Sequence, residues 1–191
     1  MVKIKQPYIL AVDLDNTLIK TDMIYIGVKF LLLYRIYLLP KLILLLLFKG
    51  KTYAKKYLFD KTSYSIENII FNQSVIDFIT NNKEKYTYTI LISGSYYKYV
   101  DAISKYIGLF DFSVGTTLDI NMISLNKIRY LKDKFGDLIF DYIGDSKKDI
   151  PIWESAKTAY VVNNANITSQ LKHIKYKICL LYTSPSPRDC L

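Results

Sequence analysis

An apolar segment that ends in two carboxylates constrains this chain more than any other feature of its sequence. Residues 10–18 read Leu-Ala-Val-Asp-Leu-Asp-Asn-Thr-Leu, a strand-like run that places Asp13 and Asp15 one residue apart. Side chains two positions apart in an extended strand point the same way, so we expect both carboxylates just beyond the carboxyl end of the strand. Two like charges held this close raise one pKa unless they share a cation or a proton. The pattern favours Mg²⁺ chemistry, with one carboxylate as nucleophile and the other as acid and base.

Two later segments also place polar groups at the end of an apolar run. Residues 89–95 read Thr-Ile-Leu-Ile-Ser-Gly-Ser, so the hydroxyl of Ser93 and the backbone N–H groups around Gly94 suit a phosphate oxygen. Residues 140–149 form an apolar strand that ends in Gly-Asp, with a second aspartate four residues further on. Asp145, at that strand end, can join Asp13 on a metal ion.

The order of apolar runs and helix-length stretches predicts an α/β protein with a doubly wound parallel sheet. Helices are expected over 95–107, 124–135 and 148–157. Ligands bind such sheets at the carboxyl ends of the strands, which is where the motifs fall. Strands are expected at five places: Tyr8–Leu14, Thr87–Ile92, Asp111–Gly115, Phe140–Gly144 and Thr158–Val162.

Residues 20–71 interrupt this alternation and predict a small helical cap inserted after the first strand. Two helices are expected over 23–39 and 41–57, separated at Pro40. Residues 42–48 are all apolar, which makes that part of the helix apolar on every side but too short to cross a bilayer. Two interpretations stay open: the cap lies against a membrane, a lipid substrate or a further domain, or its apolar helix is buried by its own neighbours.

The three strand-end motifs, at 13–17, 92–95 and 144–149, resemble those of the haloacid dehalogenase (HAD) superfamily of phosphohydrolases. The resemblance implies a Rossmann-like core made of residues 1–19 and 72–177. It also implies a Mg²⁺-dependent phosphomonoesterase in which Asp13 attacks phosphorus and forms an aspartyl phosphate. Asp15 would protonate the leaving oxygen and later activate water.

The same resemblance assigns the remaining groups of the site. Mg²⁺ would be held by Asp13, Asp145 and the carbonyl of Asp15, with Asp149 supporting the metal site or the lysine of the family. The residues expected to bind the phosphate are Ser93, Gly94, Asn16 and Thr17.

The lysine of the family has no direct counterpart. Its expected position, at the start of the helix before the last motif, falls on Ile123. Lys127 lies one helical turn later on the same face and is predicted to reach the site and offset the charge of the nucleophile and the phosphate. The alternative is that the role is empty and the activity low.

Several further segments resemble the HAD-like domain that precedes a UbiA-type polyprenyltransferase in some bacterial membrane proteins. This resemblance implies a phosphorylated small molecule or a polyprenyl-linked phosphate as substrate, and a membrane surface or fused membrane domain as partner. The alternatives are a free cytosolic small-molecule phosphatase and a non-catalytic phosphate-binding or regulatory module. The matching segments are 11–22, 109–111, 135–136, 140–142 and 149–153.

The net charge and the two ends of the chain bear on its partners and its location. The formal charge of +9 invites a nucleic-acid partner, but the chain has no basic run long enough to form a nucleic-acid tail, so we expect none. The N-terminus leads directly into the first strand without a secretory signal, which predicts a cytoplasmic location or one on the cytoplasmic face of a membrane.

Residues 178–191 change abruptly in composition and look like translated adapter DNA. A native Pro/Ser-rich end is the alternative.

Overall fold

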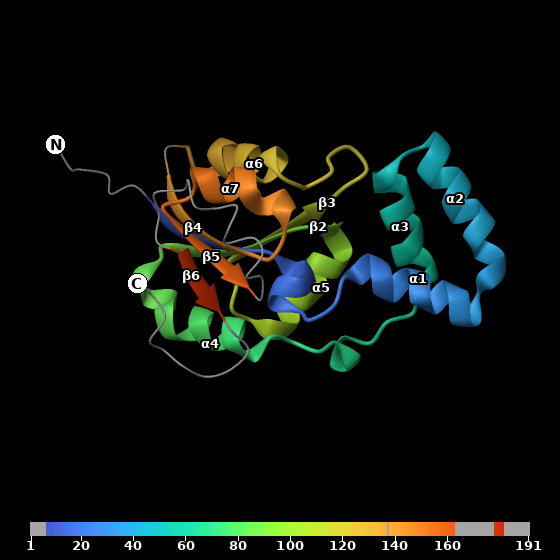
Figure 1. Ribbon diagram of the computed structural model, residues 1–191, viewed down its shortest axis with the longest axis horizontal. Coiled ribbons are helices and arrows are strands. Elements are labelled where there is room, and N and C mark those ends of the chain that lie inside the picture. Colours follow the sequence, from blue (N-terminus) through green and yellow to red (C-terminus); the bar gives the residue numbers. More distant parts are fainter. Residues whose placement is uncertain (1–6, 137, 163–177, 182–191) are drawn as a thin grey trace.

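Six parallel strands form one sheet in the order β3-β2-β1-β4-β5-β6 (Figure 1). The structure, a computed structural model, describes residues 7–136, 138–162 and 178–181. The predicted parallel α/β sheet is therefore confirmed. The strands are β1 Tyr8–Val12, β2 Tyr88–Tyr96, β3 Phe112–Thr116, β4 Ile139–Gly144, β5 Thr158–Val162 and β6 Ile178–Leu181.

Alternate residues of the strands serve two separate cores, because successive side chains of a strand point to opposite faces. Ile9 and Ala11 of β1 pack beneath α6 (Leu125–Phe135) and α7 (Ile150–Ser155). Leu10 and Val12 pack on the other face, against α4 (Gln73–Asn82) and α5 (Tyr97–Ile107). Figure 1 shows α6 and α7 on one side of the sheet and α4 on the other. Helices on both faces make the sheet doubly wound, as predicted.

The register brings the strand ends that carry the motifs to one edge. Val12 of β1 is paired with Leu91 of β2 on one side and with Ile143 of β4 on the other. The residues that follow these three positions therefore lie side by side at the same level of the sheet. Asp13 is fixed there by its own backbone, whose N–H donates to the carbonyl of Ile143 at 2.9 Å.

The inserted cap contains three helices, so the prediction of two helices separated at Pro40 is wrong. The helices are α1 (Met23–Tyr34), α2 (Leu39–Phe48) and α3 (Lys51–Lys61). Pro40 lies in the first turn of α2, where its missing N–H has no helical partner to lose. The chain turns instead at Arg35, which is non-helical, and at Gly50, whose φ of 90° favours glycine.

Short single turns connect these elements. The first of them, η1, follows β1 directly and includes Asn16 in the left-handed region, with φ of 55°. The others lie either between two helices or between a helix and a strand. Together they are η1 Leu14–Leu18, η2 Ile36–Leu38, η3 Ile66–Asn68, η4 Lys83–Lys85 and η5 Lys147–Asp149.

A narrow neck joins the cap to the core. Ile19 and Phe71 form an isolated antiparallel bridge. Next to it, the N–H of Lys20 donates to the carbonyl of Ile70 at 2.8 Å, and the N–H of Asn72 donates to that of Leu18 at 2.9 Å. The chain thus enters and leaves the cap at one place.

Helix α2 is not covered by its neighbours. It packs along α3, yet no residue of α2 is buried. This overturns the interpretation in which the cap buries its own apolar helix. No single helix in the described ranges is long and apolar enough to cross a membrane. The segments 23–34 and 36–48 reach that length and composition only as a pair, and the pair is bent by 119°.

The C-terminal strand lies in the segment that was expected to be a non-native tail. The backbone of Ile178–Leu181 forms β6 and pairs with β5 in parallel. Residues 163–177 of the expected core and 182–191 of the expected tail lie outside the described residues.

Candidate active site

A cleft of about 120 Å³ opens at the carboxyl edge of the sheet, between the core and the cap. The core supplies the acidic groups that follow β1 and β4, together with Lys127 from α6. The cap side supplies Asp22, Ile24 and Lys55. The predicted site residues that line the cleft are Asp13, Asp15, Asn16, Gly94, Lys127, Asp145 and Asp149.

Asp13 is held in a buried position at the floor of this cleft. Only 7% of the residue is exposed. Its Oδ1 accepts a hydrogen bond from Nζ of Lys127 at 2.9 Å, and the two groups form a buried ion pair. Burial raises the pKa of Asp13 to about 8, against the opposing effect of the Lys127 ammonium. The ionised form of this carboxyl group is therefore poorly solvated, and perturbed pKa values of this kind cluster at functional sites.

Lys127 connects three polar groups from different elements. Besides Asp13, its Nζ contacts the hydroxyl of Tyr142 at 2.6 Å and Oδ1 of Asp149 at 3.4 Å. The Tyr142 hydroxyl in turn donates to the same Asp149 oxygen at 2.8 Å. Burial disfavours the ammonium, but Asp13 and Asp149 outweigh it and raise the pKa of Lys127. The side chain of Lys127 thus brings a positive charge to Asp13.

Ile123 occupies the place where the lysine of the family was expected. It lines the cleft beside Ser124, which precedes α6 with φ of 48°. A Cβ on Gly94 would lie 2.8 Å from Cγ2 of Ile123, so the two residues are in close contact. An apolar side chain here covers the end of β2. The ammonium that contacts Asp13 comes instead from Lys127, one helical turn further along the chain.

Three carboxylates form a group that could hold a metal ion. Asp13, Asp145 and Asp149 each offer an oxygen atom, and these atoms lie within 4.8 Å of one another. Burial, followed by the charges of Asp149 and Asp15, raises the pKa of Asp145 to about 7. Carboxylate oxygens gathered in this way suit a hard divalent cation such as Mg²⁺, which would relieve their repulsion.

Asp149 is oriented by the turn that precedes α7. The N–H and Oγ of Ser146 donate to its Oδ2 at 3.1 and 3.0 Å. This leaves Oδ1 directed toward Lys127 and Tyr142. Gly144 is required beside it, because a Cβ there would lie 2.9 Å from Oδ2 of Asp149. The short Gly-Asp-Ser segment therefore positions the third carboxylate.

Asp15 lines the same cleft as Asp13 but has different partners. Its Oδ2 accepts from Oγ of Ser95 at 2.7 Å and from Oγ of Ser93 at 3.1 Å. Its Oδ1 accepts from the N–H of Met23 at 2.9 Å, at the start of the cap. Burial, and next the charge of Asp22, raise the pKa of Asp15, while these hydrogen bonds lower it. Its carboxylate is not in the group that could hold a metal, and only its backbone carbonyl was expected in that role.

Two of the expected phosphate-binding residues stand behind the cleft instead of lining it. Ser93 is fully buried, donates to Asp15 and accepts from the N–H of Ser95 at 3.0 Å. Thr17 is also buried, and its hydroxyl donates to Asp145 at 3.4 Å. Gly94, Asn16 and the unpredicted Ser95 do line the cleft. Direct contact of Ser93 and Thr17 with a phosphate stays a prediction.

Lys55 of the cap is a site residue that the sequence did not indicate. Its Nζ donates to the carbonyl of Gly94 at 2.5 Å and to Oδ1 of Asn121 at 2.6 Å. Burial lowers the pKa of Lys55 to about 8, although Asp15 acts in the opposite direction. Among many cap lysines it carries no distinguishing sequence signal.

One curated protein is similar in sequence. An uncharacterized protein of Sinorhizobium fredii, y4nM, is 29% identical over 158 residues, which are 81% of this chain. The chain spans 30% of the length of that relative. No protein-family profile matches the chain.

Solved structures show the same fold at low sequence identity. A protein of unknown function from Bordetella pertussis Tohama I has a TM-score of 0.69 at 11% identity, over 91% of this chain and 98% of its own. A phospho-aspartyl intermediate analogue of phosphoserine phosphatase has 0.60 at 16%, over 92% and 94%. A HAD family hydrolase from Salmonella enterica serovar Typhi has 0.61 at 16%, over 90% and 68%. The chain therefore has the fold of HAD hydrolases, as predicted.

Proposed function

We propose, from a HAD-hydrolase fold with a carboxylate-lined cleft, that this protein is a Mg²⁺-dependent phosphohydrolase that cleaves phosphomonoesters through an aspartyl phosphate. One observation carries the proposal. The buried carboxylate of Asp13 is paired with Lys127 at 2.9 Å and also belongs to the group of acids that could hold a cation. A nucleophile in contact with two sources of positive charge suits attack on an anionic phosphate.

The residues present fit a magnesium ion. Asp13, Asp145 and Asp149 offer three oxygen atoms close together. Burial, and after it the neighbouring carboxylates, raise the pKa values of Asp13 and Asp145, and a bound cation would oppose both effects. These residues, with the backbone carbonyl of Asp15, would hold Mg²⁺. When bound, the ion would neutralise charge on the phosphate and on Asp13.

The protein side chains supply the bond changes. A carboxylate oxygen of Asp13 attacks phosphorus, and the bond from phosphorus to the leaving oxygen breaks. Asp15 donates its proton to that oxygen. Asp15 then takes a proton from water, whose oxygen attacks phosphorus, so that inorganic phosphate leaves and Asp13 is restored. Burial raises the pKa of Asp15, and this supports the role because it favours the protonated form of the carboxyl group. The similarity to a phospho-aspartyl analogue supports the intermediate.

The remaining groups position the phosphate. Asn16 and the backbone at Gly94 line the cleft and are proposed to contact phosphate oxygens. Ser93 and Thr17 are proposed to act from behind, because they donate to Asp15 and Asp145. The ammonium of Lys127 favours the ionised form of Asp13 and attracts the phosphate.

The substrate is proposed to be a phosphorylated small molecule or a polyprenyl-linked phosphate. The longer curated relative supports a domain of a larger protein. The resemblance in the sequence adds the proposal that the larger protein is a UbiA-type prenyltransferase fusion and that this chain is its N-terminal part. Sequencing the source locus beyond the codon for Lys177 tests this. A reading frame that continues into several apolar segments of about 20 residues supports the fusion, whereas a stop codon near residue 191 supports a free-standing phosphatase.

The Asp13→Asn variant tests the catalytic proposal. It keeps the size of the side chain but removes the nucleophilic oxygen, so Mg²⁺-dependent release of phosphate should fall by roughly a thousandfold or more. Phosphate release from a panel of phosphomonoesters, with polyprenyl phosphates included, is the measurement. Asp133→Asn, at an exposed position of α6, is the matched control and should keep wild-type rates.

Two results would contradict this assignment. Turnover retained by Asp13→Asn would exclude Asp13 as nucleophile. Binding of Mg²⁺ and phosphate analogues by the wild type, with no turnover of any ester, would instead favour a non-catalytic phosphate-binding or regulatory module.

A further inference from the structure

The outer surface of the cap exposes apolar side chains that nothing in the described structure covers. We name the exposed apolar residues of segment 33–48 the outer face. Leu47 is 71% exposed and Phe48 is 78% exposed. Monomeric soluble domains rarely expose an apolar surface that extends over neighbouring turns. The members that the argument uses are Ile36, Tyr37, Ile43, Leu44, Leu47 and Phe48.

The position of the outer face leaves it accessible. Helix α2 forms the end of the molecule that is farthest from the sheet, with α3 between it and the core (Figure 1). The partly buried residues of α2 recur every three or four positions, at Leu39, Leu42 and Leu45, as expected for the side that packs on α3. The opposite side is directed to solvent.

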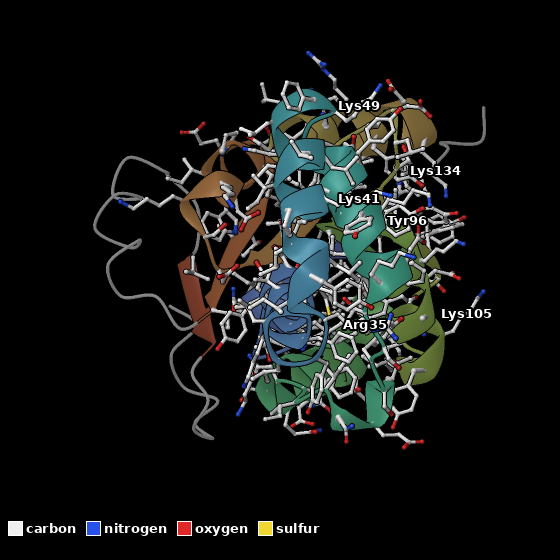
Figure 2. All side chains as sticks on the ribbon, turned by 90° about the vertical axis from the view of Figure 1, so that its right-hand side faces the viewer. Arg35, Lys41, Lys49, Tyr96, Lys105 and Lys134 are labelled. Carbon is white, nitrogen blue, oxygen red and sulfur yellow. The ribbon has the colours of Figure 1, made fainter. Side chains whose placement is uncertain are left out.

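Positive charge surrounds this apolar surface. Between Met23 and Phe59 the sequence has seven lysine and arginine residues and no aspartate or glutamate. Figure 2 views this side and shows Arg35, Lys41 and Lys49 spaced along α2 and the turn before it. All three are exposed. None of the three forms an ion pair with another described residue. Apolar residues flanked by such cations are complementary to anionic lipid headgroups above an acyl layer.

The geometry indicates binding along a surface and not across it. A spanning helix needs about 20 apolar residues, whereas α1 has 12 residues and α2 has 10. The two are bent by 119° at the break between them. From these observations we propose that the outer face docks on an anionic lipid bilayer, with Leu47 and Phe48 inserted among the acyl chains and Arg35, Lys41 and Lys49 at the headgroups.

The docking does not depend on the proposed phosphatase activity, but it would place the cleft near the bilayer. Lys55, on the helix against which α2 packs, reaches the mouth of the cleft. A substrate held in the membrane by a lipid chain would then approach from the cap side.

Vesicle flotation of the 191-residue chain tests the proposal. We expect the protein to float with phosphatidylcholine vesicles that contain phosphatidylglycerol, and much less with phosphatidylcholine alone. The double variant Leu47→Ser/Phe48→Ser should bind at least about tenfold more weakly. The matched control is Ile70→Ser/Leu125→Ser, which alters exposed apolar residues outside the outer face and should bind as the wild type does.

A charge variant independently tests the proposed contact between the basic residues and the lipid headgroups. Lys41→Glu/Lys49→Glu should lose about tenfold or more of the binding to phosphatidylglycerol vesicles, while Lys132→Glu on α6 should not. Hydrolysis of a water-soluble phosphomonoester should be unchanged in all these variants, which separates this test from that of catalysis. Absence of flotation, flotation that Leu47→Ser/Phe48→Ser does not weaken, or a dimer in solution that this variant dissociates would each overturn the proposal.

Discussion

At the scale of single residues, Lys127 is the group on which the arrangement of the site depends. Its ammonium is buried with two carboxylates and a phenol, and each of these groups lies on a different element. Buried ion pairs of this kind add little net stability, but removal of one partner leaves the others without compensation. The site should therefore be sensitive to loss of this one charge.

We expect Lys127→Met to lower the free energy of unfolding by about 3–5 kcal/mol. The substitution leaves Asp13 and Asp149 buried without their cation, and it removes the hydrogen bond that Lys127 donates to the hydroxyl of Tyr142. Denaturant unfolding in EDTA is the measurement, so that no divalent ion replaces the lost charge.

Lys132→Met is the matched control for this prediction. Lys132 lies on the same helix but is exposed, so its loss should change the stability by less than about 0.5 kcal/mol. Equal effects of the two substitutions would show that Lys127 is not held by the carboxylates.

The four aspartates of the cleft could be predicted from the sequence, whereas one of their partners could not. Asp13, Asp15, Asp145 and Asp149 could be predicted to meet because each follows a strand or a short turn after one. Tyr142 was missed because it lies inside β4, where an aromatic residue usually signals only packing, and its hydroxyl is seen to contact Asp149 only in three dimensions.

At the scale of secondary structure elements, α3 connects the cap to the core. Lys55 extends from this helix to the carbonyl of Gly94 at the end of β2 and to Asn121 in the loop after β3. Its environment is apolar enough to disfavour the charged form. The pKa of Lys55 falls to about 8 from 10.5 in the absence of burial.

This shift predicts how stability depends on pH. Between about pH 8 and 10.5 the folded state binds fewer protons at Lys55 than the unfolded state, so stability should rise with pH in this window. The cost of holding the charge is fully present below pH 8. Across this window the free energy of unfolding of the wild type should rise by about 1–2 kcal/mol relative to that of Lys55→Met. This is less than the free energy equivalent to the full pKa shift, because the group is partly solvated.

Parallel denaturant titrations at pH 7 and at about pH 10 check the effect. Lys51→Met, at an exposed position of the same helix, is the control, and its difference from the wild type should not vary with pH. A constant difference for Lys55→Met as well would show that Lys55 titrates as it does in water.

The cap helices show why element boundaries are harder to predict than element types. Helix was expected for both sides of Pro40, and helix is found. The boundaries were wrong because proline is tolerated in a first turn, and the chain breaks at Arg35 instead. Arginine is a good helix former, so its local sequence gives no sign of a break.

At the scale of the whole molecule, the sheet and its two cores were predictable. The alternation in β1, with Ile9 and Ala11 on one face and Leu10 and Val12 on the other, requires cover on both sides. The exposure of α2 was left open in the sequence analysis, because an apolar run alone does not say what covers it.

Magnesium should stabilise the molecule if it binds between β1 and β4. An ion that binds only the folded state raises the free energy of unfolding by about 2.7 kcal/mol at a hundred times its dissociation constant. The proposed ligands come from two segments, at Asp13 and at Asp145–Asp149, so binding should stabilise the fold as a whole. Thermal unfolding over a range of MgCl₂ concentrations is the measurement.

Asp145→Asn should remove most of this stabilisation, because one of the three clustered carboxylates is lost. Asp133→Asn, far from the cluster, should keep it. An equal response of both variants to MgCl₂ would place the ion elsewhere.

The neck between core and cap has a consequence for how such a protein can change over time. The bridge at Ile19 and Phe71 and the two hydrogen bonds beside it are made by main-chain atoms, which almost any sequence can supply. The amino-acid sequence and the length of the inserted segment can therefore change in evolution while the strand ends that carry Asp13 and Asp145 keep their positions. The main-chain contacts at the neck therefore set few limits on which residues the cap can contain.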